Sequence, residues 1–176
     1  MRLQQYIINE SNTIPTQEMI DFYEKRTKEH INKVRNNIKK YISTVKEGYG
    51  KSDLIKRSKE HDKSKYSNEE YLGYVWLTWF HKKKNEGDPI TLSPEVKKLT
   101  EKVWGHHKDN NRHHPEYHNN PKNMSNEDLI EMVCDWAAMS QELGTNLELW
   151  IHKNATKAKY TDNQIKLIQN VGKIVL

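Results

Sequence analysis

Apolar side chains recur at helical spacing along most of the chain. Between residues 16 and 45 they return every three or four positions, at Ile20, Tyr23, Ile31, Val34, Ile38 and Val45. This spacing places them on one face of an amphipathic helix. Similar patterns predict further helices at about residues 53–62, 71–84, 94–107, 125–143, 147–156 and 163–174. Because no segment alternates apolar and polar residues as a strand does, the pattern predicts an all-α protein of six to seven helices.

Capping residues mark several of the predicted helix ends. Ser93 precedes Pro94, which suits an N-cap followed by the first helical position. Asp53 is a candidate N-cap, and two pairs have the spacing of a capping box, Ser67 with Glu70 and Ser125 with Asp128. The helical pattern is interrupted at Gly48-Tyr49-Gly50 and at Gly144, and it is missing from the polar segment 108–123.

Length and composition indicate one domain with a lean core. The chain has 176 residues and 34% hydrophobic residues, and it carries five Trp and nine Tyr. These aromatic side chains and a modest net charge argue against disorder. We expect a single helical domain over residues 1–176, with its core at about 16–145 and C-terminal helices at 146–176 packing on it. A bound metal would help to hold so small an apolar core.

Several classes of protein are disfavoured. No apolar run approaches the roughly 18–20 residues that span a bilayer, and the first ten residues contain no signal-peptide stretch. The lone Cys134 excludes an internal disulfide scaffold, so we expect a cytoplasmic protein. A net charge of +5 permits nucleic-acid binding, but the positive charge is mostly lysine spread along helices. Nucleic acid is therefore a less favoured partner than a small molecule.

Two groups of residues suggest metal chemistry. Five of the nine histidines fall within 13 positions, at His106, His107, His113, His114 and His118. The adjacent pair His61-Asp62 is accompanied by His30 on an inward-facing stripe and by Asp135 among apolar residues. A carboxylate in such surroundings is costly to bury unless it is paired or bound to a metal. Two structural alternatives stay open: a polar loop with ordinary histidines, and an acidic helix face formed by Asp128, Glu131, Asp135 and Glu142.

The order of these residues resembles the HD superfamily of metal-dependent phosphohydrolases, whose metal-binding pattern is H…HD…D. The match runs over about residues 20–145, through His30, His61-Asp62 and Asp135. The chain also resembles the HD-GYP branch, since HDKSK matches HD-x-x-K and His106-His107 matches its HH pair. The letters GYP are absent, which argues against cyclic-di-GMP activity. As a whole the chain looks most like an uncharacterised HD-like family of bacteria and their viruses.

The resemblance implies a metal site and a hydrolytic reaction. Its ligands would be His30, His61, Asp62 and Asp135, with His106 or His107 joined by His81 or His113 if there is a second ion. Imidazoles with carboxylates suit Mn²⁺, Fe²⁺, Co²⁺, Ni²⁺ or Zn²⁺. Lys65, four residues after His61, would act with Asp62 in catalysis by stabilising charge on phosphate. Substrate contacts are expected from His113 and His114 in the polar segment, and from the neighbouring cations Lys108 and Arg112.

Three functions follow as hypotheses. The first is a metal-dependent phosphohydrolase acting on a nucleotide or another small phosphate ester. The second keeps the fold but has the chemistry of the HD-type di-iron oxygenases, which the surplus histidines permit. The third is a non-enzymatic protein that binds nucleic acid through lysines and aromatic rings. The resemblance places the protein in a bacterial cytoplasm, or in the host cytoplasm if it is viral, and a homo-oligomer is left open.

Overall fold

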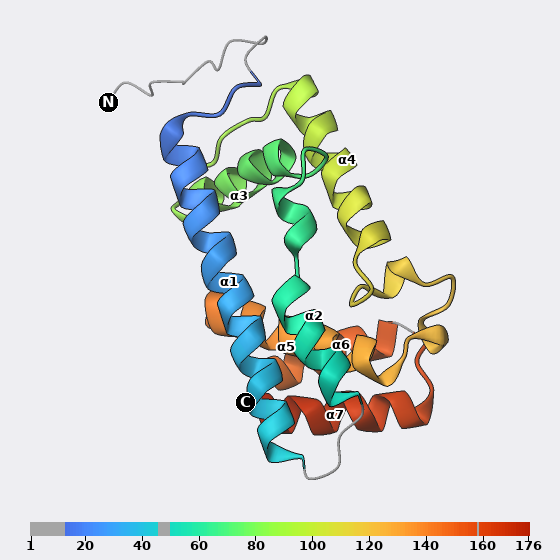
Figure 1. Cartoon of the computed structure of the whole chain (residues 1–176). Helices are drawn as coiled ribbons and strands as arrows, with labels where there is room; N and C mark the ends of the chain where they lie inside the picture. Colours follow the sequence, from blue (N-terminus) through green and yellow to red (C-terminus); the bar gives the residue numbers. More distant parts are fainter. Residues whose placement is uncertain (1–12, 46–49, 158) are drawn as a thin grey trace. The chain divides into compact units, whose positions relative to one another are not determined.

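The computed structural model describes residues 13–45, 50–157 and 159–176, and these residues are helical or irregular, with no strand (Figure 1). Its helices are α1 (Gln17–Thr44), α2 (Lys51–Glu60), α3 (Tyr71–Asn85), α4 (Pro94–Asn110), α5 (Asn126–Leu143), α6 (Leu147–Lys157) and α7 (Asp162–Val175). Three single 3₁₀ turns lie at Lys63–Tyr66, Pro115–Tyr117 and Pro121–Asn123. The prediction of an all-α fold with six to seven helices is confirmed. None of the described helices is both long and apolar enough to cross a membrane.

Helix ends agree with the capping analysis in part. The box at Ser125 and Asp128 is present, and Thr161 with Gln164 forms a second box at the start of α7. Asp53 is not an N-cap, because α2 begins at Lys51 after Gly50, whose φ of 45° is left-handed. The predicted break at 48–50 otherwise lies outside the described residues. The box at Ser67 is also wrong: Glu70 is itself the N-cap residue of α3, and its carboxylate binds histidines instead.

The chain divides into two compact units. Among the described residues, the first comprises 13–26 together with Ser64–His107, and the second comprises those between Thr27 and Lys63 and between Lys108 and Leu176. The boundaries fall inside α1 and α4, so each of these helices contributes to both units. Each unit has its own cluster of buried apolar side chains.

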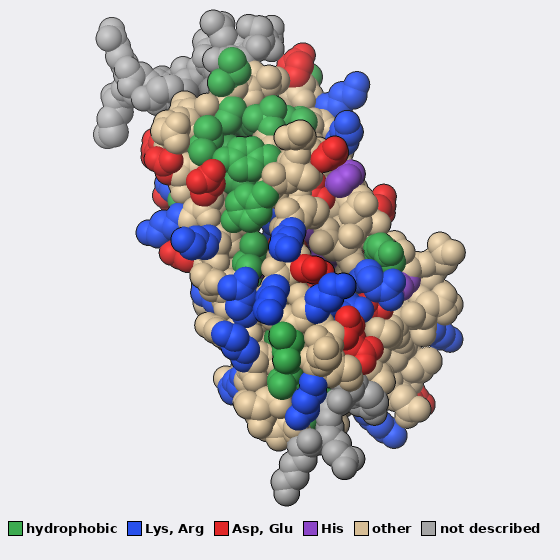
Figure 2. Space-filling view, viewed as in Figure 1, with side chains coloured by type: hydrophobic (Ala, Val, Ile, Leu, Met, Phe, Trp, Pro, Cys, Tyr) green, Lys and Arg blue, Asp and Glu red, His purple; other side chains and the backbone are tan. Residues whose placement is uncertain are grey.

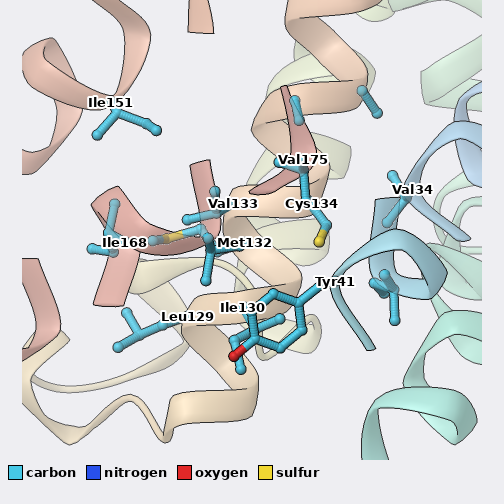
Figure 3. Close-up of a cluster of buried hydrophobic side chains, with 14 of the residues drawn as sticks. Val34, Tyr41, Leu129, Ile130, Met132, Val133, Cys134, Ile151, Ile168 and Val175 are labelled. Carbon is cyan, nitrogen blue, oxygen red and sulfur yellow. The ribbon is translucent and has the colours of Figure 1, made fainter. Parts of the chain in front are cut away.

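The second unit is built around α5, against which α2, α6 and α7 pack. Figure 3 shows its core, where Leu129, Met132 and Val133 of α5 lie with Ile168 of α7, and all four are fully or nearly fully buried. Burial extends around most of α5 and includes the polar residues Asp128 and Glu131. A helix buried on several sides must pair its charged groups internally.

The first unit has a smaller core in which α3 and α4 approach closely. Tyr23, Val75, Val96 and Val103 are almost fully buried there. The close approach occurs at Gly73, where an added Cβ would lie 2.7 Å from Cγ1 and 2.8 Å from Cβ of Val103. Gly73 is therefore required by packing and not by its backbone conformation.

We expect Gly73→Ala to lower the free energy of unfolding by about 1–3 kcal/mol, because the new methyl group overpacks this contact. Gly105→Ala is the matched control, since Gly105 also lies in a helix of the first unit but has no atom within 4 Å of an added Cβ. Gly105→Ala should raise stability by about 0.5–1 kcal/mol through helix propensity. Urea denaturation of both variants checks this, and equal effects would contradict the close approach.

Candidate metal centre

Five metal-ligating side chains converge within the second unit. His30 comes from α1, His61 and Asp62 follow α2, His113 comes from the segment after α4, and Asp135 comes from α5. The potential ligand atoms of His30, His61 and Asp62 lie within 4.8 Å of one another, as do those of His61, His113 and Asp135. The three imidazoles and Asp62 are buried, and the Asp135 side chain is 14% exposed. The structure thus brings together the four ligands expected for a first ion and places His113, expected only for a second ion or for substrate, beside them.

The Nε2 atoms of the three histidines face the two aspartates. Nε2 of His30 lies 2.9 Å from Oδ1 of Asp135 and 3.5 Å from Oδ2 of Asp62. Nε2 of His61 lies 3.5 Å from Oδ2 of Asp62 and 3.6 Å from Oδ1 of Asp135. Nε2 of His113 lies 3.6 Å from Oδ1 of Asp62. Two ligands of one transition-metal ion are separated by about 3.0–3.5 Å, so these spacings suit a shared ion.

The Nδ1 atoms of the same rings face glutamates of α5. Nδ1 of His61 donates to Oε1 of Glu131 at 2.9 Å, and Nδ1 of His113 lies 3.5 Å from the same oxygen. Nδ1 of His30 lies 3.7 Å from Oε2 of Glu142. Ligating histidines in proteins commonly have a carboxylate behind the ring in this way.

The electrostatics of the cluster favour a positive charge at its centre. Burial alone would lower the pKa of His61, but Asp62, Asp135 and Glu131 outweigh it and raise that pKa to about 10. Burial would raise the pKa of Asp135, yet His30 and His61 hold it well below its usual range. The pKa of His113 is well below its usual value because of burial and the neighbouring His61 and His114. A lowered pKa favours the neutral imidazole, which is the form that binds metals.

The burial and the chemical types of the ligand atoms also fit a divalent transition metal. Nε2 of His61 is buried, and its carboxylate neighbours Asp62 and Asp135 lie 3.5 and 3.6 Å away, too far for short hydrogen bonds. A metal ion between this nitrogen and the carboxylates would satisfy all three groups. Three imidazoles with two carboxylates match the ligand preferences of Mn²⁺, Fe²⁺, Co²⁺, Ni²⁺ and Zn²⁺.

The backbone at Asp62 has an uncommon conformation. Its φ of 56° makes it the one non-glycine residue with positive φ in the described part of the chain. Asp is among the residues that tolerate this region, although at some cost. Asp62 directly follows His61, the C-cap residue of α2, and connects it to the 3₁₀ turn at Lys63–Tyr66. Uncommon backbone of this kind concentrates at functional sites.

A network of arginines and carboxylates contacts the centre through Glu131, on the Nδ1 side of its histidines. Asp128 is fully buried and accepts from Nη1 of Arg57 at 2.7 Å and from two nitrogens of Arg112 at 3.0 Å. Nη1 of Arg57 also lies 3.3 Å from Oε2 of Glu131. The acidic face that was the alternative for Asp135 therefore exists, but it is turned inward onto arginine and histidine partners.

His106 and His107 belong to the first unit, where they share one carboxylate. Their Nδ1 atoms donate to Oε1 and Oε2 of Glu70 at 2.8 and 2.9 Å, and Ser64 donates to the same glutamate at 3.0 Å. These contacts lower the pKa of Glu70 against its burial, which would raise it. Both rings are thus held by Nδ1, and their role as metal ligands stays a prediction.

The remaining candidates have carboxylate or aromatic neighbours. Lys65 lies over the ring of Tyr74 within the first unit, and Lys108 lies 3.5 Å from Glu116. Arg112 pairs with Asp128, which gives it a structural contact. The rings of His114 and His113 lie 4.3 Å apart and are tilted by 42°. Catalysis by Lys65 and substrate binding by Lys108, Arg112 and His114 stay predictions, whereas the position of His113 favours a ligand role over the substrate role expected from sequence.

Sequence reasoning placed Glu131 on a possible acidic face and Glu70 in a capping box, and it linked neither glutamate to the histidines. Glu131 precedes Asp135 by four residues, so both lie on the same face of α5 and reach the same histidines. That spacing is the signal that would have identified Glu131. The contact of Glu70 with His106 and His107 spans more than 35 residues, and no local pattern indicates it.

Comparisons with known proteins provide a family but no activity. No curated protein and no solved structure matches the chain. Residues 19–175 match the family of unknown function DUF5662, and this match spans both units and all five residues of the cluster. The chain belongs to the DUF5662 family.

Proposed function

We propose that this protein is a metal-dependent phosphohydrolase acting on a nucleotide or another small phosphate ester. The observation that carries the proposal is the convergence of His30, His61, Asp62 and Asp135 in one unit, with Nε2 atoms facing carboxylates. Their order along the chain is the one that resembles the HD superfamily. A mixed imidazole and carboxylate site of this kind is typical of metal-assisted hydrolysis.

The residues of the chain divide the proposed task. His30, His61, His113, Asp62 and Asp135 would hold the ion. A bound ion would activate water at neutral pH and neutralise charge developing on a phosphoryl group. The Asp62 carboxylate lies 3.5–3.6 Å from Nε2 of all three imidazoles, so it would share an ion with them. The part exposure of Asp135 leaves this side of the cluster accessible to a substrate.

Removing the metal should destabilise the protein. An ion bound only by the folded state at 100 times its Kd adds about 2.7 kcal/mol to stability. For a chain of this length we therefore expect EDTA to lower Tm by roughly 5–10 °C, and Mn²⁺ or Zn²⁺ to restore it. Differential scanning fluorimetry of purified protein measures both. A Tm that neither chelator nor metal changes would count against the centre.

The reaction is tested with the metal-loaded protein and a panel of nucleoside mono-, di- and triphosphates. Release of phosphate that depends on Mn²⁺ or Co²⁺ supports hydrolysis. A mixed-valent iron EPR signal with O₂ consumption, and no phosphate release, would instead support the oxygenase hypothesis. Binding of nucleic acid that is indifferent to chelator and falls with salt would support the third hypothesis. On the face shown in Figure 2, basic side chains lie among acidic and hydrophobic ones, which does not favour that outcome.

A further inference from the structure

Glu131 faces the Nδ1 atoms of two proposed ligands, His61 and His113. It is 5% exposed, and its Oε1 atom accepts from Nδ1 of His61 at 2.9 Å and lies 3.5 Å from Nδ1 of His113. Its other oxygen, Oε2, lies 3.3 Å from Nη1 of Arg57. Both carboxylate oxygens are therefore in use within the second unit.

These contacts determine which ring nitrogen carries a proton. An ionised carboxylate can only accept, so Nδ1 of His61 must be the donor. A ring that binds a metal gives up its other proton, so the lone pair is then on Nε2, the atom that faces Asp62 and Asp135. An unsupported imidazole would populate the other tautomer as well and would rotate about its χ angles.

Arg57 keeps the carboxylate in place. Its Nη1 bridges Asp128 and Glu131, which are three residues apart on α5, and its Nε donates to Asp53 at 2.6 Å. Arg57 therefore keeps two other acidic partners if the charge of Glu131 is removed. The positive charge of Arg57 is therefore balanced without Glu131, so pairing with Arg57 does not by itself explain the glutamate at position 131.

We propose that Glu131, held by Arg57, is the positioning residue of the metal centre. It orients His61 and His113 so that both present Nε2 to one ion, and in this way it sets the affinity for a divalent transition metal. The inference rests on the proposed metal site and deepens it. Loss of such a supporting carboxylate typically weakens metal binding by about 10- to 100-fold.

Two variants separate the acceptor from the charge. Glu131→Gln loses the charge but keeps a carbonyl oxygen that can accept from Nδ1, and Glu131→Leu loses both. Glu148→Gln is the control, because Glu148 is an exposed glutamate on α6 of the same unit. Affinity for Zn²⁺ is measured by competition with a chromophoric chelator, and the ligand geometry is followed by the visible absorption of bound Co²⁺.

We expect Zn²⁺ affinity to fall about 10-fold in Glu131→Gln and about 100-fold in Glu131→Leu. The Co²⁺ spectrum should change in Glu131→Leu and stay close to that of the unmodified protein in Glu131→Gln. Glu148→Gln should bind both metals normally. Equal weakening by Gln and Leu would assign the effect to lost charge and overturn the positioning role, as would unchanged affinity in both.

The two proposals fail in different ways. If the unmodified protein binds neither Zn²⁺ nor Co²⁺, the metal centre itself is wrong. If it binds both and the folded Glu131 variants bind equally well, only the positioning role is wrong. Circular dichroism establishes folding. If Glu131→Leu does not fold, Glu131→Gln decides, since unchanged Zn²⁺ affinity in that variant overturns the inference.

Discussion

Asp62→Asn is expected to remove bound metal from the protein while leaving its helices intact. The Asp62 carboxylate is 1% exposed and lies 3.5–3.6 Å from Nε2 of His30, His61 and His113. It is the group that contacts all three rings. An amide of the same shape keeps one oxygen but loses the negative charge that a cation requires. We expect metal affinity and metal-dependent phosphate release to fall by roughly 100-fold or more.

The choice of asparagine keeps the backbone at position 62 in its native conformation. Asn tolerates the positive φ found there, whereas Ala would add strain to the loss of the ligand. Asp109→Asn is the matched control, because Asp109 is exposed at the end of α4. Metal content by mass spectrometry, phosphate release and circular dichroism are measured together. Native metal content in Asp62→Asn would remove Asp62 from the ligand set.

Asp128→Ala should destabilise the protein by about 3–5 kcal/mol, a loss of roughly 10 °C or more in Tm. Asp128 is fully buried and accepts from Arg57, from two nitrogens of Arg112 and from the backbone N–H of Ser125. Without it the guanidinium of Arg57, which is 17% exposed, loses its shortest contact to a buried carboxylate. The capping box at the start of α5 is lost as well.

Asp53→Ala provides the comparison for Asp128→Ala. Asp53 also pairs with Arg57, but its side chain is 48% exposed, so its loss should cost less than about 1 kcal/mol. Guanidinium denaturation of both variants gives the two free energies. Burial would raise the pKa of Asp128, but Arg112, Ser125 and Arg57 lower it. Its contribution is therefore complete above the ordinary Asp pKa and declines as pH falls through the lowered value. If Asp128→Ala and Asp53→Ala lose the same free energy of unfolding, the buried ion pairs of Asp128 do not stabilise the fold as proposed.

The sequence alone determined the helices and predicted four residues of the candidate centre, together with His106 and His107, which contact Glu70 instead. Helices form where apolar residues recur every three or four positions, and that period is a local property of the chain. His30 was placed by its helical stripe, and Asp135 by its apolar neighbours. The pair His61-Asp62 was placed by adjacency. Each of these patterns extends over no more than about one helix of the sequence.

Only the tertiary structure decided what surrounds those four residues. His113 lies in a segment without helical periodicity, so its burial against His61 depends on how that segment packs within the second unit. From the sequence, Glu131 belongs to a possible solvated acidic face, but α5 is buried on several sides and Glu131 is buried with it. Glu70 has capping-box spacing from Ser67, yet two histidines more than 35 residues away compete for its carboxylate. A charged side chain takes the partners that burial leaves it, and burial is set by the packing of distant segments.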